Sequence, residues 1–203
     1  MSVKPVKNRP YLYGLTGGIA SGKSTASNFF IDKGVKVFDS DFYVKRLWVE
    51  NESLIETVNK KYNINMETDS GKKELADIIF SDELEKIYIN SLIHPLVFDA
   101  IEKWIEENIN EKYLVIDMPL LFESSYENKV DKTIVIYTGR RNQITRLMKR
   151  DGLKRVDAEK RIKSQIDLKL KKSMASLVIN NNSTIDKLYK KLELLYEVME
   201  NEN

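Results

Sequence analysis

The segment GGIASGKST, residues 17–25, combines glycines and other small residues with a single lysine. It satisfies the pattern G-x-x-x-x-G-K-[ST], which ends here in Gly22, Lys23 and Ser24. Glycines let the backbone curl so that its N–H groups surround phosphate oxygens, a geometry that Cβ atoms would obstruct. The lysine supplies positive charge to the outer phosphates of a nucleotide, and the hydroxyl of Ser24 is a ligand for Mg²⁺. The segment therefore predicts a nucleotide-phosphate site that takes Mg²⁺.

Two carboxylates, Asp39 and Asp41, lie at the end of the apolar segment 35–39, which is a predicted strand. Ligands bind at the carboxyl ends of strands in open parallel sheets, so we expect these carboxylates near the phosphates. Either could accept the proton of a hydroxyl group that attacks a γ-phosphate, or hold Mg²⁺ through water. Alternatively, Asp41 only caps the helix that follows. Asp117, which ends the third predicted strand, is a further candidate for holding Mg²⁺ through water.

A guanine-reading motif is the main competing signal. Residues 128–131, NKVD, match the N-K-x-D tetrapeptide of GTPase switches. Such a tetrapeptide should follow a strand at its carboxyl end, whereas this one precedes the predicted strand 133–137. The chain also contains no D-x-x-G loop that could sense a γ-phosphate. We therefore discount a GTPase switch.

The elements that must position these residues follow from hydrophobic patterning. Five short β-forming segments have apolar residues that run together, which is typical of strands covered on both faces: 11–16, 35–39, 113–117, 133–137 and 177–180. Helical patterns follow the first two over 24–33 and 41 to about 60, and another ends the chain with Leu188, Leu192, Leu195 and Met199. Strands that alternate with helices predict an α/β domain with a mainly parallel sheet.

A helical region interrupts this alternation between about 61 and 110. Ser81-Asp82 is a predicted helix cap within it, and Pro95 is expected to end or kink a helix at His94. The region therefore reads as an insert on the α/β core.

A basic stretch is the second interruption. Residues 140–150 and 156–172 have the patterns of two helices joined around Asp151-Gly152. From Thr138 to Lys172 the chain holds 13 Lys and Arg residues against 4 Asp and Glu, although its net charge is only +2 overall. Such a stretch predicts either a solvated helical face or contact with an anion, of which nucleic acid is one.

Length and composition exclude several classes of protein. A chain of 203 residues with 42% hydrophobic residues suits one globular domain. The absence of cysteine excludes disulfides, cysteine-ligated zinc and thiol catalysis, and it fits the reducing cytoplasm, where we expect the protein. The amino terminus lacks the apolar core of a signal peptide, and no apolar run approaches the roughly 18 residues of a membrane span.

Beyond the phosphate motif, several segments resemble the dephospho-CoA kinase family of P-loop kinases. In order they are LTGGIASGKST (15–25), FDSD (38–41), HPLV (94–97), PLLFE (119–123), QITRLMKRD (143–151), Gln165 and VINNN (178–182). The phosphate motif alone is shared with many enzymes, whereas HP, PLLFE and QxxRLxxRD in this order are far more specific. The resemblance spans nearly the whole chain and implies a kinase that uses ATP to phosphorylate the ribose 3′-hydroxyl of dephospho-CoA.

The resemblance also implies roles for single residues. Asp41 matches the family's base for the 3′-hydroxyl, and Arg146 matches an arginine near the transferring phosphate, so the implied catalytic residues are these two and Lys23. ATP would be held by Gly17, Gly18, Ile19, Ala20, Ser21, Gly22, Lys23, Ser24, Thr25 and Arg150, with Mg²⁺ on Ser24. The acceptor would be held by Asp41, His94, Pro95, Leu120, Leu121 and Glu123.

Local patterns leave plainer alternatives for some of these residues. His94 could simply end a helix before Pro95. Residues 119–122 could be the buried exit of a strand. Arg146 and Arg150 lie four apart on one helical face, where they could act on one anion or form an exposed pair.

The resemblance implies a P-loop kinase fold with three parts. They are a five-stranded, mostly parallel core (about 10–60, 111–138 and 173–203), a helical acceptor-binding insert (about 61–110) and a basic helical lid over ATP (about 139–172). The implied partners are ATP and dephospho-CoA, with no nucleic acid and no membrane, and the oligomeric state stays open. Another nucleoside or nucleotide kinase is the nearest alternative, and a nucleotide-dependent switch or nucleic-acid-binding ATPase is a distant one. The chain departs from the family pattern at Ser176 and Ser183, where aspartate and glycine are usual near the adenine.

Overall fold

The computed structural model describes residues 9–202, which contain one five-stranded sheet. In spatial order its strands are β2 (Val37–Asp39), β3 (Tyr113–Asp117), β1 (Tyr11–Gly17), β4 (Lys132–Tyr137) and β5 (Leu177–Asn180). β1 pairs in parallel with β3 and β4, and β4 pairs in parallel with β5. The predicted α/β fold with a mostly parallel, five-stranded core is confirmed.

The strand register brings the carboxyl ends of the three central strands to one edge of the sheet. Leu15 of β1 lies opposite Asp117 of β3, and Gly17 of β1 lies opposite Ile136 of β4. In this strand order the chain moves to one side after β1 and to the other side after β3. Open parallel sheets bind ligands at such a switch point.

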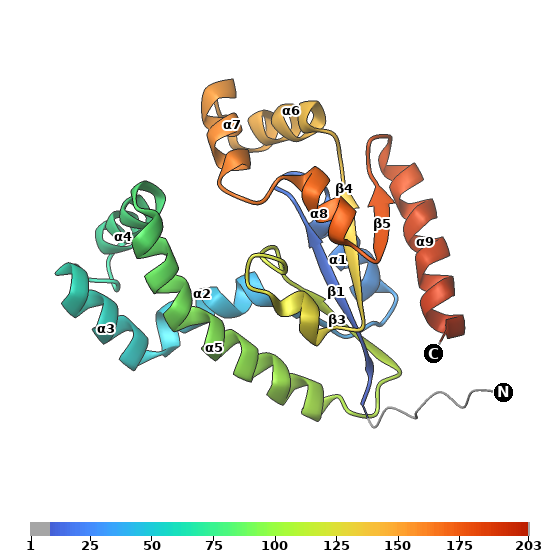
Figure 1. Ribbon diagram of the computed structural model, residues 1–203, viewed down its shortest axis with the longest axis horizontal. Helices are drawn as coiled ribbons and strands as arrows, with labels where there is room; N and C mark the ends of the chain where they lie inside the picture. Colours follow the sequence, from blue (N-terminus) through green and yellow to red (C-terminus); the bar gives the residue numbers. More distant parts are fainter. Residues whose placement is uncertain (1–8, 203) are drawn as a thin grey trace. The chain divides into compact units, whose positions relative to one another are not determined.

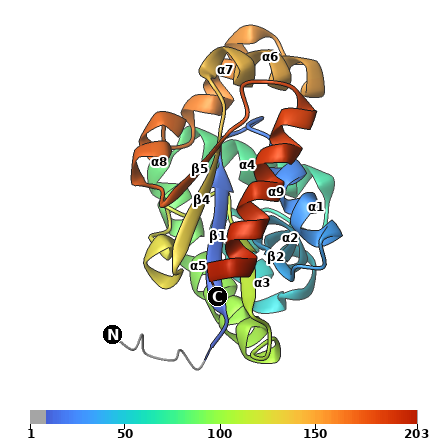
Figure 2. The same ribbon diagram turned by 90° about the vertical axis from the view of Figure 1, so that its right-hand side faces the viewer.

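Helices cover both faces of the sheet. α1 (Lys23–Asp32) and α9 (Ile185–Glu202) lie on one face, and α8 (Leu168–Met174) lies on the other (Figure 2). Phe30 of α1 and Leu192 of α9 pack with Tyr13 of β1 in the main core. On the opposite face, Leu168 of α8 packs with Val135 of β4. Burial on both faces explains why the apolar residues of the strands do not alternate with polar ones.

Two helices with a small core of their own follow β4. They are α6 (Arg140–Asp151) and α7 (Arg155–Lys163), which lie beyond the carboxyl end of β4 (Figure 1). Ile144, Leu147, Ala158 and Ile162 form this core. The predicted single helix over 156–172 is wrong, because residues 164–167 separate α7 from α8. The Asp167 side chain accepts a hydrogen bond from the Lys169 N–H at 2.7 Å and so caps a new helix there.

Residues Asp39 to Trp104 form a compact unit distinct from the described residues up to Phe38 and from Ile105 onward. This unit contains α2 (Ser40–Glu50), α3 (Glu52–Tyr62), α4 (Asp69–Ser81) and most of α5 (Glu83–Glu107). It begins earlier along the chain than the insert expected at about residue 61. The single helix expected from 41 to about 60 is also wrong, because Asn51 leaves helical geometry and its side chain accepts from the Leu54 N–H at 2.9 Å.

α5 continues through Pro95. Of the two expectations at His94, an end or a kink of the helix, the end is therefore wrong, and the kink stays a prediction. Proline removes one backbone donor from the ladder, whereas Ile89, Ile93, Val97 and Ile101 are buried at four-residue spacing on both sides of it. Asp82 caps α5 by accepting from the Leu84 N–H at 2.8 Å, as predicted. Within the described residues, no helix combines the length and apolar character that spanning a membrane requires.

Candidate active site

The residues after β1 form a tight loop that leads directly into α1. Ala20 and Gly22 adopt left-handed backbone angles, with φ values of 58° and 98°. The Ser21 N–H donates to the Gly18 carbonyl oxygen at 3.0 Å. A Cβ atom on Gly22 would lie 2.3 Å from the side-chain nitrogen of Asn181. Both its backbone angle and its close neighbour therefore require glycine at this position.

Two side chains from later in the chain, Asn181 and Arg146, bind a carbonyl oxygen of this loop. The Ser21 carbonyl oxygen accepts from Asn181 Nδ2 at 2.8 Å and from Arg146 Nη1 at 3.5 Å. Arg146 also donates to the Asn181 carbonyl oxygen at 2.9 Å. The first N–H groups of α1 have no acceptor within the helix and form its positive end. This arrangement suits the loop to bind an anion through its amides.

Lys23, the first residue of α1, reaches the carboxyl end of the neighbouring strand β3. Its Nζ lies 2.5 Å from Asp117 Oδ1, and the two side chains are 16% and 3% exposed. An ammonium group can exchange a carboxylate for phosphate oxygens, because both are anionic oxygen acceptors. The structure thus brings together the lysine and the aspartate that the sequence singled out.

The oxygen donors at this place fit Mg²⁺. Ser24 is exposed in the first turn of α1, one residue after Lys23. Residues 9–202 contain no group of three or more His, Cys, Asp or Glu side chains that could cage a metal. Magnesium at phosphoryl-transfer sites is usually held by one or two protein oxygens together with substrate phosphates and water. The hydroxyl of Ser24 and the carboxylate of Asp117 suit that kind of site.

Of the two arginines predicted on α6, only Arg146 contacts the loop. Arg150 is exposed and donates to the Asp151 carboxylate at 2.7 and 3.2 Å. Arg161 also donates to this carboxylate, at 3.1 Å. Hydrogen bonding to Arg150 lowers the pKa of Asp151 below its usual value. In this conformation the Arg150 guanidinium therefore belongs to a surface ion-pair network within the predicted lid.

Two glutamines from the basic stretch bind the backbone of one loop residue, Ile19, on both sides. Gln143 Nε2 donates to the Ile19 carbonyl oxygen at 2.8 Å, and the Ile19 N–H donates to Gln165 Oε1 at 3.2 Å. Sequence reasoning gave neither glutamine a role, although both fall in the segments that carry the family resemblance. Their contacts tie the base of the predicted lid to the phosphate loop.

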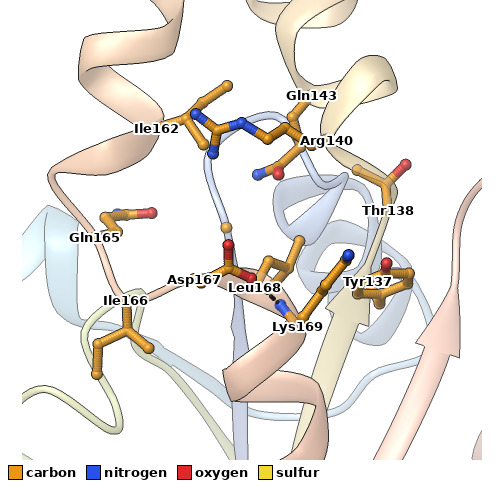
Figure 3. Close-up of a pocket in the computed structure, with 11 residues that line it drawn as sticks. Tyr137, Thr138, Arg140, Gln143, Ile162, Gln165, Ile166, Asp167, Leu168 and Lys169 are labelled. Carbon is orange, nitrogen blue, oxygen red and sulfur yellow. Dashed lines mark hydrogen bonds between the residues drawn. The ribbon is translucent and has the colours of Figure 1, made fainter.

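A pocket of about 110 Å³ lies beside Gly18, between the end of β4 and the two glutamines (Figure 3). Arg140, Gln143 and Thr138 line one part of it, and Asp167 and Lys169 line another. Figure 3 shows side chains of both charges around the opening. The pocket adds a space next to the loop that both charged and apolar side chains line.

The PLLFE segment follows β3 and contacts both the loop's root and α8. The Pro119 carbonyl oxygen accepts from Thr16 Oγ1 at 3.0 Å and from Lys171 Nζ at 2.8 Å. Glu123 Oε1 accepts from the Ile166 N–H at 3.2 Å and pairs with Lys171 at 2.8 Å. Lys171 is completely buried. Sequence reasoning missed this residue, because it is one of many cations in a basic stretch.

The two leucines of this segment differ in exposure. Leu121 is completely buried and packs so closely on β1 that a Cβ atom on Gly14 would lie 2.9 Å from it. Leu120 keeps an exposed part. Packing of the core therefore accounts for Leu121, and Leu120 is the leucine that a ligand could reach.

Within the second unit, Asp39 and Asp41 have different surroundings. Asp39 caps α2, because its Oδ1 accepts from the Phe42 N–H at 2.9 Å. Asp41 is exposed in the first turn of α2. The alternative that Asp41 merely caps the helix is therefore wrong.

His94 and Pro95 lie in the middle of α5, where His94 is half-buried and Pro95 is exposed. The His94 ring stacks on Phe98 with ring centroids 5.7 Å apart. Burial lowers the pKa of His94 below its usual value. An imidazole in this position favours its neutral form.

Comparison with known proteins decides the family. The dephospho-CoA kinase family model matches residues 11–187. The dephospho-CoA kinase of Fusobacterium nucleatum subsp. nucleatum is 36% identical over 191 residues, which are 93% of this chain and 98% of that relative. The chain belongs to the dephospho-CoA kinase family. It is therefore a P-loop kinase, as its sequence segments predicted.

Solved structures agree with the dephospho-CoA kinase family. Dephospho-CoA kinase from Campylobacter jejuni superposes with a TM-score of 0.70 at 27% identity, covering 95% of this chain and 98% of that one. The protein TT1252 from Thermus thermophilus shares the fold with a TM-score of 0.80 at 23% identity, covering 94% and 98%.

The NKVD tetrapeptide has a structural role in this kinase. The Asp131 carboxylate accepts from Arg9 at 2.8 and 3.1 Å and from the Leu12 N–H at 2.8 Å. These contacts tie the segment before β4 to the start of β1, at the opposite edge of the sheet from the phosphate loop. This accounts for the aspartate without guanine recognition.

Ser176, one of the departures from the family pattern, also has a visible function. Its N–H donates to Thr133 Oγ1 at 2.9 Å, and its hydroxyl oxygen accepts from the Thr133 N–H at 3.2 Å. These bonds fasten the start of β5 to β4.

Proposed function

We propose that this kinase transfers the γ-phosphate of ATP to the ribose 3′-hydroxyl of dephospho-CoA, giving CoA and ADP. The observation that carries the proposal is the meeting of two cations at the loop of residues 17–24. Lys23 begins the helix that follows the loop, and Arg146 binds the carbonyl oxygen of Ser21. Membership of the dephospho-CoA kinase family supports the choice of acceptor.

In this proposal the loop amides and Lys23 hold the ATP phosphates. Lys23 leaves Asp117 for the β- and γ-phosphate oxygens, which its flexible side chain allows. Arg146 neutralises negative charge that develops on the transferring phosphoryl group, because it is already anchored beside the loop. Arg150 joins it only if it exchanges Asp151 for a phosphate.

Ser24 and Asp117 are the residues that would hold Mg²⁺, Ser24 through its hydroxyl and Asp117 through water. When bound, the ion neutralises charge on the phosphate oxygens. Every other contribution in this proposal comes from side chains and amides of the chain itself.

Asp41 accepts the proton of the 3′-hydroxyl in this proposal. Its exposed carboxylate lies on the first turn of α2, and Asp39 already serves as the cap. General-base catalysis of this kind needs an ionised carboxylate that a substrate hydroxyl can reach. The acceptor itself would contact His94, Pro95, Leu120 and Glu123.

Residues 139–172 act as the lid in this proposal. Closing a lid over ATP excludes water, which strengthens each charge contact and prevents hydrolysis of the nucleotide. Gln143 and Gln165 connect this region to the loop that it would cover. We further propose that the reaction takes place in the cytoplasm with small molecules as the only substrates.

A panel of acceptors tests the proposal. Purified protein with ATP and Mg²⁺ would be offered dephospho-CoA, adenosine, AMP and shikimate, and ADP formation would be measured. We expect strong preference for dephospho-CoA, with the new phosphate on the ribose 3′-position by NMR. Equal or faster transfer to a nucleoside or nucleotide would contradict the proposed acceptor, and transfer to none of them would contradict kinase function.

A further inference from the structure

The buried cation Lys171 is the least expected feature of the region around the phosphate loop. It lies in the middle of α8, and its side chain has no exposed surface. Its neighbours in the sequence, Leu170 and Lys172, are both exposed. The fold therefore selects this one lysine among several for burial.

Burying this ammonium group carries a penalty that apolar packing would avoid. Moving a charge out of water costs several kcal/mol even after relaxation, and replacing a buried ion pair by apolar residues is often neutral or stabilising. Leu168, on the same short helix, packs into an apolar cluster with Phe122. Apolar residues at both 171 and 123 would avoid the penalty, so the presence of this ion pair beside the phosphate loop calls for an explanation besides stability.

The contacts of Lys171 point toward the phosphate site. Its Nζ lies 2.8 Å from Glu123 Oε1 and 2.8 Å from the Pro119 carbonyl oxygen. This carbonyl oxygen also accepts from Thr16 Oγ1 at 3.0 Å, and Thr16 directly precedes the loop. Lys171 and Thr16 together therefore fix the turn after β3 against the root of the loop.

The turn after β3 directly follows Asp117, the carboxylate that pairs with Lys23. Asp117 stands two residues before Pro119, and it binds Lys23 at 2.5 Å. The Met118 N–H between them donates to the Leu15 carbonyl oxygen at 2.9 Å, so the backbone here is anchored. The contacts at Met118 and Pro119 together hold the backbone that carries the Asp117 carboxylate.

Charge connects the two lysines as well. Burial is the largest cause that lowers the pKa of Lys171, Glu123 opposes that shift, and the positive charge of Lys23 adds to it. The two ammonium groups therefore lie within electrostatic reach of each other. Each has its own carboxylate partner, Asp117 for Lys23 and Glu123 for Lys171.

We propose that Lys171 is a positioning residue of the phosphate site. It acts through Pro119 and Glu123, which hold the turn after β3 in place and thereby set where Asp117 and Lys23 lie. Its buried charge also makes the site more attractive to the anionic phosphates of ATP. This inference rests on the proposed function, in which Lys23 binds those phosphates.

The test compares Lys171→Met and Lys171→Arg with Lys190→Met. The last variant removes the same charge from an exposed position of α9, outside the proposed lid, and serves as the control. ATP affinity is measured first, by titration without any acceptor, at a temperature well below the unfolding midpoint of each variant. We expect Lys171→Met to weaken ATP binding about tenfold and Lys190→Met to stay within twofold of the wild type.

Turnover with dephospho-CoA is the second readout. Small displacements of a reacting group cost about 100-fold in rate, so kcat of Lys171→Met should fall by about that factor. Lys171→Arg, which keeps the charge, should recover most of kcat. A purely structural role would instead lower the unfolding temperature of Lys171→Met and leave kcat and ATP affinity as in the wild type.

A double variant, Lys171→Met with Glu123→Gln, keeps the proposal testable if the single variant does not fold. Removing both charges leaves no carboxylate without its ammonium partner, so this protein should fold. Wild-type ATP affinity in the folded double variant would overturn the proposal, and affinity reduced as in Lys171→Met would support it. Failure of the wild type to phosphorylate dephospho-CoA would contradict the proposed function alone, because ATP binding is measured without acceptor.

Discussion

Asp39 and Asp41 show how two carboxylates separated by one residue can have different tasks. The Asp39 carboxylate accepts a hydrogen bond from the Phe42 N–H at 2.9 Å and so caps α2. Asp41 extends from the first helical turn with an exposed side chain. A general base has to be within reach of the substrate hydroxyl, and the exposed side chain of Asp41 is consistent with that requirement, whereas Asp39 serves as the cap.

Replacing Asp41 by asparagine should therefore separate catalysis from binding. We expect Asp41→Asn to lower kcat by about 100-fold or more, because asparagine cannot accept the proton, while ATP affinity stays near the wild-type value. Steady-state kinetics and an ATP titration provide the two numbers. Asp69→Asn is the matched control, since Asp69 is also exposed in the first turn of a helix in the same unit. Turnover that survives in Asp41→Asn nearly intact would exclude this residue as the base.

His94 gives the kinase a stability that depends on pH. Burial lowers its pKa in the folded state below the ordinary value of about 6.5, so the unfolded chain binds a proton more readily. The contribution of neutral His94 to the free energy of unfolding is therefore fully present above about pH 6.5. It is lost as the pH falls toward and through the lower pKa of the folded state. His94 is the only histidine of the chain, which makes the effect separable.

Urea unfolding of the wild type and of His94→Gln at about pH 7.5 and about pH 5.5 measures this effect. We expect the wild type to lose more stability than the variant between the two values, because glutamine does not titrate. Carboxylates titrate in both proteins and so cancel in the comparison. Parallel losses in the two proteins would show that burial of the imidazole has no energetic consequence.

At the scale of elements, the strands and the phosphate loop could be predicted from the sequence because their signals are local. The apolar runs of β1 and β3 are buried on both faces, and the glycine at position 22 is required by its own backbone angle. Helix boundaries were predicted less well. Asn51 ends one helix and caps the next. The hydrogen bond that its side chain accepts from the Leu54 N–H leaves no break in the apolar periodicity.

The site residues that sequence reasoning missed are held by contacts that are distant along the chain. Asn181 and Lys171 contact groups far away along the chain, Ser21 in one case and Pro119 in the other. No local pattern distinguishes Lys171 from the exposed Lys172 beside it. Its burial follows from the break before α8, which the sequence pattern did not indicate.

The cap at Asn51 can be measured directly. Asn51→Ala removes the acceptor for the Leu54 N–H, and loss of such a cap costs about 1 kcal/mol of folding stability. Asn51→Asp keeps an acceptor and should retain the wild-type stability in urea unfolding. If the alanine variant were as stable as the aspartate variant, the side chain of Asn51 would not be what divides α2 from α3.

The proposed functional residues are distributed over two compact units of the chain. The loop, Lys23 and Arg146 belong to one unit, and Asp41 and His94 belong to the other. Each unit has its own core, with Leu192 buried in the first and Val58 in the second. The residues proposed to bind ATP all lie in the first unit, so binding of ATP can be measured without an acceptor.

Binding of ATP should stabilise the folded protein through Lys23. A ligand present at about 100 times its Kd adds about 2.7 kcal/mol of stability, so ATP with Mg²⁺ should raise the unfolding temperature of the wild type. Lys23→Ala should lose most of this rise, and EDTA should diminish it in the wild type because Mg²⁺ neutralises part of the phosphate charge. Lys33→Ala is the control, since Lys33 caps the end of α1, forms an exposed ion pair with Glu193 and should leave the rise unchanged. An undiminished rise in Lys23→Ala would mean that the nucleotide phosphates bind elsewhere than the loop of residues 17–24.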